Sequence, residues 1–351
     1  MDSAQLLALV GALRGRRVAV IGDVVADEFV YGRIARVSRE APVLILEYDS
    51  TEIVPGGAGN AANNVASLGG TAALAAVVGR DEPGQRLLRA LHKRVDPRRV
   101  TRAAGRPTPV KTRILAGGIH SAKQQVVRID RSVANGFDDR ARATFERQAI
   151  AACAGADAVF VSDYGSGLVT PAVVRRVRAS IDGGIPILID TRHKLLDYRG
   201  LTACTPNESE VEQALGVRIN DHLRVLEQAG RELLERTRMR AVLITRGSRG
   251  MALFVKGAPT LHIPIYGSDE IADVTGAGDT VMATMALALA AGATFELAAR
   301  LANYAGGLVV MKRGTATVSA AELLTAVRNE GRGRADVRRG RALARPGQRR
   351  G

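Results

Sequence analysis

An acidic residue directly after a run of small residues is the feature of this sequence that points most clearly to chemistry. Gly276, Ala277 and Gly278 precede Asp279, and residues 280–289 are mostly apolar and predict a buried helix. The first N–H groups of a helix stabilise anions, phosphate included. Asp279 could then orient an attacking hydroxyl and accept its proton while those N–H groups hold the transferred phosphoryl group. The alternative is a glycine-rich helix start that Asp279 merely caps.

A second glycine-rich segment lies near residue 60. Gly56 and Gly57 open a predicted helix of small residues in which Asn60 and Asn64 lie one turn apart on the same face. Glycine lets the backbone approach a ligand closely, and amides that donate and accept hydrogen bonds suit a polyhydroxylated ligand. Packing of small residues would explain the glycines and alanines, but not both asparagines.

Two carboxylates follow the first predicted strand. Residues 17–22 are a short apolar run that ends in glycine, and Asp23 and Asp27 come after it. Ligands of open α/β sheets bind beyond the carboxyl ends of the strands. We therefore expect both carboxylates to accept hydrogen bonds from sugar hydroxyls, with capping of a turn as the alternative.

An amide and a carboxylate begin a further predicted helix. Asn207 and Glu210 are three residues apart, so they would lie side by side at the helix start. This placement suits the ordering of Mg²⁺ and its water molecules near the phosphates of a nucleotide. A helix cap is the alternative explanation of Asn207.

Short apolar runs alternate with helical segments along most of the chain. Buried strands are predicted at residues 17–22, 158–162, 185–189 and 241–245, a closing hairpin at 251–265, and helices at 171–181, 297–311 and 319–328. Repeated strand–helix–strand units with right-handed crossovers predict an α/β fold, with a central, mostly parallel sheet and helices on both faces.

Two extended stretches interrupt this alternation, at about residues 29–54 and 108–130. Neither has a helical period, so we expect a small separate β-sheet that forms a lid over the ligand. Such a sheet has exposed edges and one apolar face, which favours pairing with a second copy of the chain as a homodimer. Ordinary edge strands of the main sheet are the alternative.

The composition fits one α/β domain followed by a tail. The chain has 351 residues, 38 glycines, no Trp and 3% aromatic residues, so its core must be aliphatic. Of the net charge of +15, +7 lies in the last 21 residues, which contain eight Arg and one Asp. We expect one domain at 1–330 and a disordered tail at 331–351. The tail lacks aromatic residues for base stacking, so nucleic acid is not an expected partner.

No segment suggests secretion or a membrane span. Cys153 and Cys204 lack metal-binding spacing and fit small core residues in a reducing cytosol. The start of the chain has its basic cluster after the apolar stretch, the reverse of a signal peptide. The longest uncharged run, residues 280–295, is too short to cross a bilayer. We therefore expect a cytoplasmic protein.

Two of these segments together resemble the paired motifs of a known family. The stretch from Gly56 through Gly69 to Gly79, and the stretch from Asp273 to Asp279, are similar to the two motifs of the PfkB family of carbohydrate kinases, also called the ribokinase family. In the second motif Thr284 stands where the family usually has Ala or Gly. The resemblance covers about residues 16–328 and implies a ribokinase-like fold and an ATP-dependent sugar kinase.

Within the family, the sequence is most similar to the kinases that phosphorylate D-glycero-D-manno-heptose 7-phosphate. That resemblance implies transfer to the anomeric hydroxyl, giving the 1,7-bisphosphate used for ADP-heptose and lipopolysaccharide core. It rests on segments that include the lid: residues 22–24, 31–32, 36–43, 124–130 and 162–165. Departures occur at Ser166, where relatives commonly have Lys, at Thr191-Arg192, where they have Pro-Lys, and at the lid tip, residues 117–121.

Alternatives to this substrate remain. Another sugar kinase of the family could act on fructose, a hexose phosphate, ribose or a nucleoside. A catalytically silent protein of the same fold could instead bind nucleic acid or an acidic surface through its basic tail. Many heptose kinases are fused to a nucleotidyltransferase, and because this chain ends in the Arg-rich tail we expect no second activity in it.

The resemblance also implies a role for each candidate residue. Asp279 would be the base on the anomeric hydroxyl, with Gly276, Ala277 and Gly278 as the anion hole. Mg²⁺ would be organised by Asn207 and Glu210, ATP would lie along Thr245, Gly247 and Asn303, and the sugar along Asp23, Asp27, Gly56, Gly57 and Asn60. The implied cofactors are ATP and Mg²⁺, with room for a monovalent cation. We add Arg113 and Arg128 of the lid as ligands of a distal phosphate, because guanidinium pairs with phosphate in a bidentate way.

Overall fold

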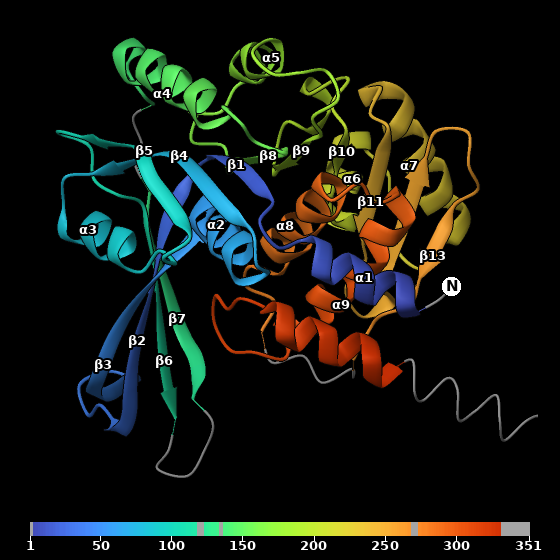
Figure 1. The fold of residues 1–351 in the computed structure, drawn as a ribbon. Coiled ribbons are helices and arrows are strands. Elements are labelled where there is room, and N and C mark those ends of the chain that lie inside the picture. The colour runs from blue at the N-terminus through green and yellow to red at the C-terminus, as the bar shows by residue number, and fades with distance from the viewer. Residues whose placement is uncertain (1–2, 118–122, 133–135, 268–272, 331–351) are drawn as a thin grey trace, which may run out of the picture.

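A nine-stranded sheet runs through the centre of the described part of the computed structural model, with helices on both sides (Figure 1). The structure describes residues 3–117, 123–132, 136–267 and 273–330. The strands of this sheet are β1 (Arg17–Gly22), β4 (Thr71–Gly79), β5 (Val95–Ala103), β8 (Ala158–Asp163), β9 (Ile187–Thr191), β10 (Ala203–Cys204), β11 (Ala241–Thr245), β12 (Met251–Val255) and β13 (Leu261–Ile263). Their order is β13-β12-β11-β10-β9-β8-β1-β4-β5.

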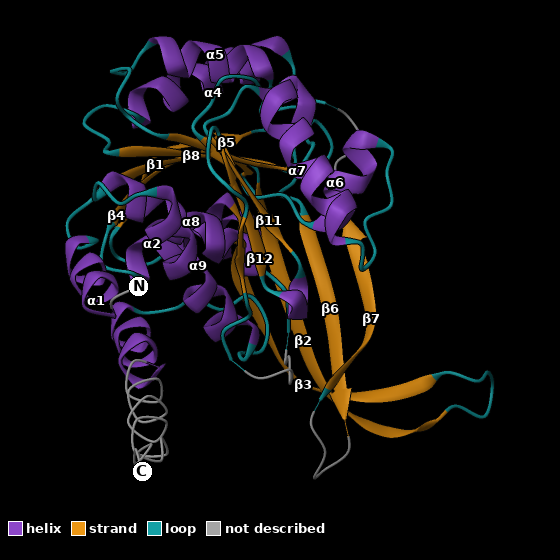
Figure 2. Ribbon diagram, turned by 90° about the vertical axis from the view of Figure 1, so that its right-hand side faces the viewer, coloured by secondary structure: helices purple, strands orange, loops and turns teal. Residues whose placement is uncertain are grey.

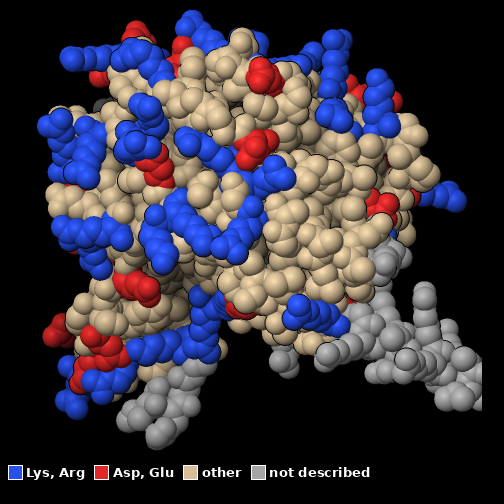
Figure 3. All heavy atoms as spheres, in the orientation of Figure 1, with Lys and Arg blue, Asp and Glu red and all other residues tan. Residues whose placement is uncertain are grey.

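All strand pairs from β11 to β5 are parallel, and only β12 and β13 join in an antiparallel way. This confirms the predicted parallel sheet. Sequence analysis had not expected strands at β4 and β5. Alanine dominates β4, so its apolar run does not favour a strand over a helix. β5 is a sheet edge whose arginines are exposed, and basic side chains gather over it in Figure 3.

Helices cover both faces of the sheet. On one face lie α1 (Ser3–Ala12), α2 (Ala58–Ser67), α3 (Glu82–Arg89), α8 (Ala277–Ala290) and α9 (Phe295–Val310). On the other lie α4 (Asp139–Ala152), α5 (Pro171–Ala179), α6 (Glu208–Leu215) and α7 (Leu223–Thr237). Short 3₁₀ turns occur at Leu195–Asp197 and Gly247–Arg249. Side chains of β1 point alternately to the two faces of the sheet. Val18 and Val20 pack in the core with α2 and α8, and Ala19 and Ile21 pack in the core with α4 and α5.

The predicted helix boundaries rest on specific caps. Thr170 accepts a hydrogen bond from Val173 N at 3.2 Å and starts α5, as predicted, although the helix ends at Ala179 rather than near 181. Ser319 and Glu322 form a reciprocal cap at the start of the helix predicted at 319–328, which spans residues 320–330 in the structure. Across the described ranges, no helix combines the length and apolar character needed to cross a bilayer.

The two stretches predicted as a lid form a separate four-stranded sheet. Its strands are β2 (Val24–Val37), β3 (Leu44–Gly57), β6 (Val110–Gly117) and β7 (Gln124–Arg131), in the order β3-β2-β6-β7. Figure 2 shows these strands extending away from the helices and the main sheet. β2 starts two residues after β1, so the lid joins the main sheet at the carboxyl end of a central strand. The predicted Arg-rich tail and most of the lid tip lie outside the described residues.

Candidate active site

Asp279 lies in the first turn of α8 and is 2% exposed. Its Oδ2 accepts a hydrogen bond from Asn60 Nδ2 at 2.9 Å, and its Oδ1 accepts one from the Tyr164 hydroxyl at 3.3 Å. Burial raises the pKa of this carboxyl to about 7, while the Asn60 hydrogen bond acts in the opposite direction. A carboxyl that titrates near neutral pH can accept a proton from a hydroxyl more readily than an ordinary Asp.

The predicted glycine-rich start of α8 contains a tight turn at Gly276. Gly276 precedes the helix with φ of 78°, and a Cβ there would lie 2.5 Å from Asn60 Nδ2. Asp273 holds the preceding loop, because its two oxygens accept hydrogen bonds from Thr275 N and Gly314 N at 2.8 and 3.0 Å. Ala277 N donates to Val274 O at 3.2 Å, so in this structure that amide takes part in the turn.

A cavity of about 350 Å³ lies at this helix start. The three residues predicted to bind ATP line it, together with the three small residues that precede Asp279, with Asp279 itself, and with Asn207 and Glu210. Asn303 is held in its wall by a hydrogen bond from Nδ2 to Pro264 O at 2.9 Å. β11 delivers Thr245, whose N donates to Pro206 O at 2.9 Å. Residues far apart in the sequence are therefore brought to one cavity.

Asn207 and Glu210 form a reciprocal cap at the start of α6. Asn207 Oδ1 accepts from Glu210 N, and Glu210 Oε2 accepts from Asn207 N, both at 2.9 Å. The cap that we considered as the alternative is thus present, and both residues also line the cavity. Burial raises the pKa of Glu210. Asp190, on the same cavity wall, has its pKa raised to about 8 by burial, with Asp279 and Glu210 adding to the effect.

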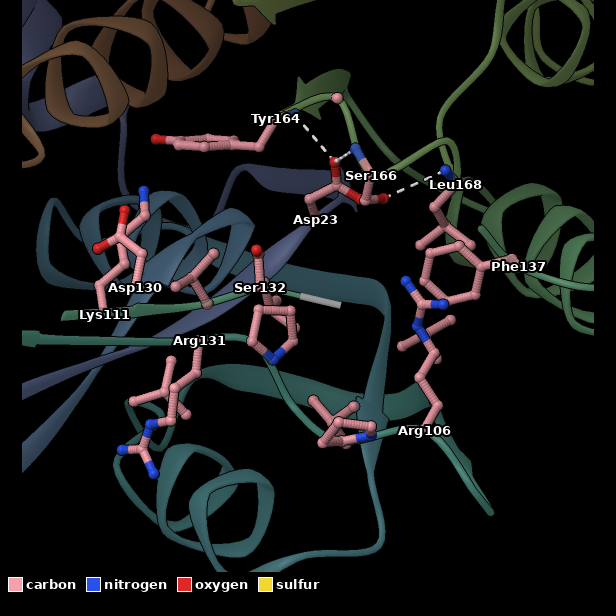
Figure 4. Close-up of a pocket in the computed structure, with 18 of the residues that line it drawn as sticks. Asp23, Arg106, Lys111, Asp130, Arg131, Ser132, Phe137, Tyr164, Ser166 and Leu168 are labelled. Atoms are coloured by element: carbon pink, nitrogen blue, oxygen red, sulfur yellow. Dashed lines mark hydrogen bonds between the residues drawn. The ribbon is translucent and has the colours of Figure 1, made fainter. Parts of the chain in front are cut away.

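A second cavity, of about 340 Å³, adjoins the first. Tyr164 and Arg192 line both cavities, and the Arg192 guanidinium lies 4.4 Å from the centre of the Tyr164 ring. Figure 4 shows Lys111 and Asp130 side by side on one wall of the second cavity, with Arg106 against Phe137 on the opposite side. Five of its lining residues are Lys or Arg, namely Arg106, Lys111, Arg128, Arg131 and Arg192. Its surroundings are therefore suited to an anionic ligand.

Asp23 lines this second cavity but is held by the loop after β8. Its carboxylate accepts hydrogen bonds from Tyr164 N at 2.9 Å and from the Ser166 hydroxyl at 2.5 Å (Figure 4). Burial raises its pKa, and these hydrogen bonds oppose that effect. Ser166, a departure from the family pattern, thus has a definite partner in Asp23.

Asp27 of β2 and Arg113 of β6 form a buried ion pair within the lid sheet. Arg113 Nη1 lies 2.6 Å from Asp27 Oδ1, and Thr315 donates to Asp27 Oδ2 at 2.9 Å. Gly56 allows this packing, because a Cβ there would lie 2.3 Å from Asp27 Oδ2. Arg113 does not line either cavity, whereas Arg128 lines the second. Of our two candidates for a distal phosphate, the structure places only Arg128 where a ligand could reach it.

The remaining residues predicted to line the sugar lie beside the cavities. Asn60 contacts Asp279, and Gly57, with φ of 57°, lies where a Cβ would come within 2.4 Å of Asp23 O. With Asp27 and Gly56, they lie outside the lining of both cavities. Direct contact of these four residues with a sugar stays a prediction.

Sequence analysis assigned no role in the site to Tyr164, Lys111 or Asp190. Asp190 follows a predicted strand, and that position was a usable signal, because ligands of parallel sheets bind beyond the carboxyl ends of the strands. Lys111 and Tyr164 depend on how the lid and the loop after β8 approach α8. Such an approach is a tertiary contact, and no local pattern in the sequence records it.

Comparison with known proteins identifies the family. The model of the pfkB family carbohydrate kinases matches residues 16–322. The chain belongs to this family. As a PfkB protein it is an ATP-dependent carbohydrate kinase, which the resemblance of its two glycine-rich motifs had predicted.

Curated relatives agree with this assignment, and solved structures share the fold. The chain is 38% identical over 330 residues to "Bifunctional protein HldE" of Pelobacter propionicus, covering 93% of this chain and 66% of that protein. It is 42% identical over 332 residues to the protein of the same name from Caulobacter vibrioides, covering 92% and 65%. The chain thus spans about two thirds of the length of these relatives. Among solved structures, Arabidopsis thaliana ribokinase, complexed with ribose and ATP, has a TM-score of 0.66 at 20% identity, covering 90% of this chain and 99% of that one. This PfkB protein therefore has the ribokinase-like fold that we predicted.

Proposed function

We propose that this kinase transfers the γ-phosphoryl group of ATP to the anomeric hydroxyl of D-glycero-D-manno-heptose 7-phosphate. The observation that carries the proposal is the basic second cavity, which meets the first beside Tyr164 and Asp279. A sugar with its reacting hydroxyl at Asp279 would have its far end among Lys and Arg side chains. The relatives named HldE support the resemblance to heptose kinases described above.

In this proposal Asp279 is the base that takes the proton of the attacking hydroxyl. Asn60 and Tyr164 hold its two oxygens, so the carboxylate is oriented before substrate binds. The helix start at Gly276, Ala277 and Gly278 would stabilise charge on the phosphoryl group during transfer. The proton passes from the sugar hydroxyl to the Asp279 carboxylate as the new O–P bond forms and the bond to ADP breaks.

The nucleotide would occupy the first cavity, along Thr245, Gly247 and Asn303. Asn207 and Glu210 fit a divalent cation, because they present an amide and a carboxylate to a cavity whose acidic groups have raised pKa values. When bound, Mg²⁺ would neutralise the phosphates and these carboxylates. The proposal also includes a monovalent cation. It places the reaction in the cytoplasm, where ATP is available.

The far phosphate of the sugar would bind to the lid. In the register of β6 and β7, Lys111 lies opposite Asp130 and Arg113 opposite Arg128, so these side chains share one face. Burial lowers the pKa of Lys111, and the neighbouring Arg192 adds to that effect. A phosphate would offset this local excess of positive charge. Arg128 is now paired with Asp130 at 2.5 Å and would exchange that carboxylate for phosphate.

The first test is ATP consumption by the purified protein with Mg²⁺ and a panel of acceptors: heptose 7-phosphate, fructose, fructose phosphates, ribose and adenosine. We expect kcat/KM for heptose 7-phosphate to exceed that of each other acceptor by at least about 100-fold, since two charge-assisted hydrogen bonds to phosphate would be lost without it. Equal or better turnover of another sugar would keep the kinase and overturn the substrate.

We further propose that two copies pair through the lid as a homodimer. Eight of the eleven large apolar side chains that are exposed in the described ranges lie at residues 34–48 and 126–129, so they are concentrated on the lid. Val127 and Ile129 are 47% and 50% exposed and, by register, lie on the face opposite Lys111 and Arg113. An apolar sheet face of this kind favours a protein partner. A second copy would cover it without blocking the cavity side.

The double substitution Val127→Glu and Ile129→Glu should convert the proposed dimer to a monomer. We expect the mass measured by sedimentation equilibrium at micromolar protein concentration to fall to that of one chain, because buried unpaired carboxylates oppose association. Leu223→Glu is the matched control, as Leu223 is 52% exposed at the start of α7, outside the lid. A monomeric wild type, or a double variant that stays dimeric, would contradict lid pairing.

A further inference from the structure

A chain of buried side-chain hydrogen bonds leads from Asp279 into the contact between α2 and α8. Asn60 Nδ2 donates to Asp279 Oδ2, and Asn64 Nδ2 donates to Asn60 Oδ1 at 3.1 Å. The Thr280 hydroxyl lies 3.1 Å from Asn64 Oδ1. None of these four residues is more than 2% exposed. The active-site carboxylate is therefore connected to polar groups, Asn64 and Thr280, that line neither cavity.

Backbone groups at both ends fix the direction of the Asn64 amide. Val318 N, which can only donate, lies 3.4 Å from Asn64 Oδ1. The carbonyl oxygen of Asn60, which can only accept, lies 3.1 Å from Asn64 Nδ2. A reversed Asn64 amide would place donor against donor at Val318 and acceptor against acceptor at Asn60. The orientation of Asn64 is thus determined without reference to any ligand.

The direction of Asn60 follows from that of Asn64. Because Asn64 Nδ2 is a donor, the oxygen of the Asn60 amide must face it, and the NH₂ group of Asn60 must face the other way. There it reaches Asp279 Oδ2 and also Gly276 O, at 3.4 Å. The reversed Asn60 amide would set its oxygen against the carboxylate of Asp279.

We propose that Asn64 is a positioning residue that fixes the Asn60 amide, so that an NH₂ donor always faces the carboxylate of Asp279. The proposal rests on the role of Asp279 as the base, which is part of the proposed function. Asn64 touches no cavity described above. It acts on catalysis through Asn60 alone, by keeping the carboxylate ionised and pointed at the hydroxyl.

Helix packing does not require this arrangement. α2 and α8 are in contact, and both contribute small, fully buried apolar residues to the same core, among them Ala58, Ala61 and Ala62 of α2 and Ala283 of α8. An apolar side chain at residue 64 could fill the same space. A buried amide is present instead. Each polar group of this network has a hydrogen-bond partner, and such a network is rigid and favours one arrangement.

Asn63 provides a natural comparison on the same helix. It is 9% exposed, and its amide joins Ala90 O at 3.3 Å and His92 N at 2.8 Å, on the side away from Asp279. Its side chain thus secures α2 to the segment after α3. Loss of Asn63 removes two side-chain hydrogen bonds and loss of Asn64 removes four, and only Asn64 is linked to the base.

The groups around Asp279 decide what its pH dependence reports. Asn60 from α2 and Tyr164 from the loop after β8 donate to it, Asp27 from β2 opposes its ionisation, and Arg192 after β9 favours it. Asp190 of β9 is a further carboxyl nearby. Removing Asn64 leaves the other groups in place, so a shift in the acidic limb of the profile would report the freed Asn60 amide.

The test compares Asn64→Ala with Asn63→Ala by measuring kcat, KM for ATP and the pH profile of kcat/KM from pH 5.5 to 9.5. For Asn64→Ala we expect kcat at pH 7 to fall about 10–100-fold and the acidic midpoint to rise by about one pH unit, because a lost hydrogen bond to a charged group raises the pKa of that carboxyl. KM for ATP should change by less than about twofold. For Asn63→Ala we expect a loss of stability with the midpoint unchanged.

Asn64→Asp is the second variant, for use where the alanine variant does not fold. Its shape is that of Asn64, and its carboxylate can still accept from Val318 N and Thr280. It cannot donate to Asn60, so the Asn60 amide would turn its NH₂ toward residue 64 and its oxygen toward Asp279. We expect a larger loss of kcat than in Asn64→Ala, together with an upward shift of the acidic midpoint.

Asp279→Asn is assayed in parallel to test the role of Asp279 as the base separately from the positioning role of Asn64. An active Asp279→Asn would overturn the proposed base, and with it the ground for this inference. An inactive Asp279→Asn together with a wild-type pH profile and kcat in both Asn64 variants would overturn only the positioning role of Asn64.

Discussion

Asp279→Asn should lower kcat by about 10²–10⁴-fold, the range ordinarily lost with a general base, while the Kd for ATP stays within about twofold. The amide keeps the size of Asp279 and still accepts a hydrogen bond from Asn60, so the nucleotide cavity is preserved. What it cannot do is accept the proton of the sugar hydroxyl. Steady-state kinetics and calorimetric titration with ATP measure the two quantities. Asp182→Asn, on an exposed loop, is the control and should leave both unchanged.

The same variant should be more stable than the wild type at pH 8. Burial raises the pKa of Asp279 to about 7, above that of the unfolded chain, so the folded state disfavours the ionised form. The resulting loss of stability is absent below pH 4, grows as the pH rises, and is complete above pH 7. Each unit of pKa shift corresponds to about 1.4 kcal/mol, and we expect a gain of at least about 1 kcal/mol at pH 8 that vanishes near pH 4. Equal stability at both pH values would contradict an ionised, buried carboxylate.

Much of the fold could be predicted because its signals are local. The runs at β1, β8 and β11, the Thr170-Pro171 helix start and the glycine turn before α8 each depend on residues adjacent in the sequence. The lid was predictable for a related reason, since its two stretches lack the period of the helices around them. β4 escaped because an alanine-rich run does not distinguish a strand from a helix.

The site was harder to predict where partners come from distant segments. Nothing near Arg113 indicates that Asp27, 86 residues earlier, will neutralise it in the interior. Asn60 was expected to face a sugar, and its hydrogen-bond partner in the structure is a carboxylate 219 residues away. Residue type therefore predicted which chemistry is present, whereas the pairing of charges required the fold.

The double substitution Lys111→Met and Arg128→Met should remove the preference for a phosphorylated sugar. We expect kcat/KM for heptose 7-phosphate to fall about 10²–10³-fold, since each charge-assisted hydrogen bond to phosphate contributes about tenfold or more. Turnover of the heptose without its 7-phosphate should change by less than about threefold, because Asp279 and the nucleotide cavity are untouched. Arg33→Met is the matched control, as Arg33 is on the lid but pairs with Asp49 outside the cavity.

Arg113→Met should behave differently from that double variant. The side chains of Arg113 and Asp27 are 9% and 7% exposed. Removing the Arg113 guanidinium therefore leaves the Asp27 carboxylate buried without its ion-pair partner. This typically costs about 3–5 kcal/mol of stability, and we expect activity on phosphorylated and unphosphorylated sugars to fall together. A selective loss with phosphorylated sugars in Arg113→Met, and none in the Lys111 and Arg128 variant, would move the phosphate from the second cavity to the Asp27–Arg113 pair within the lid sheet.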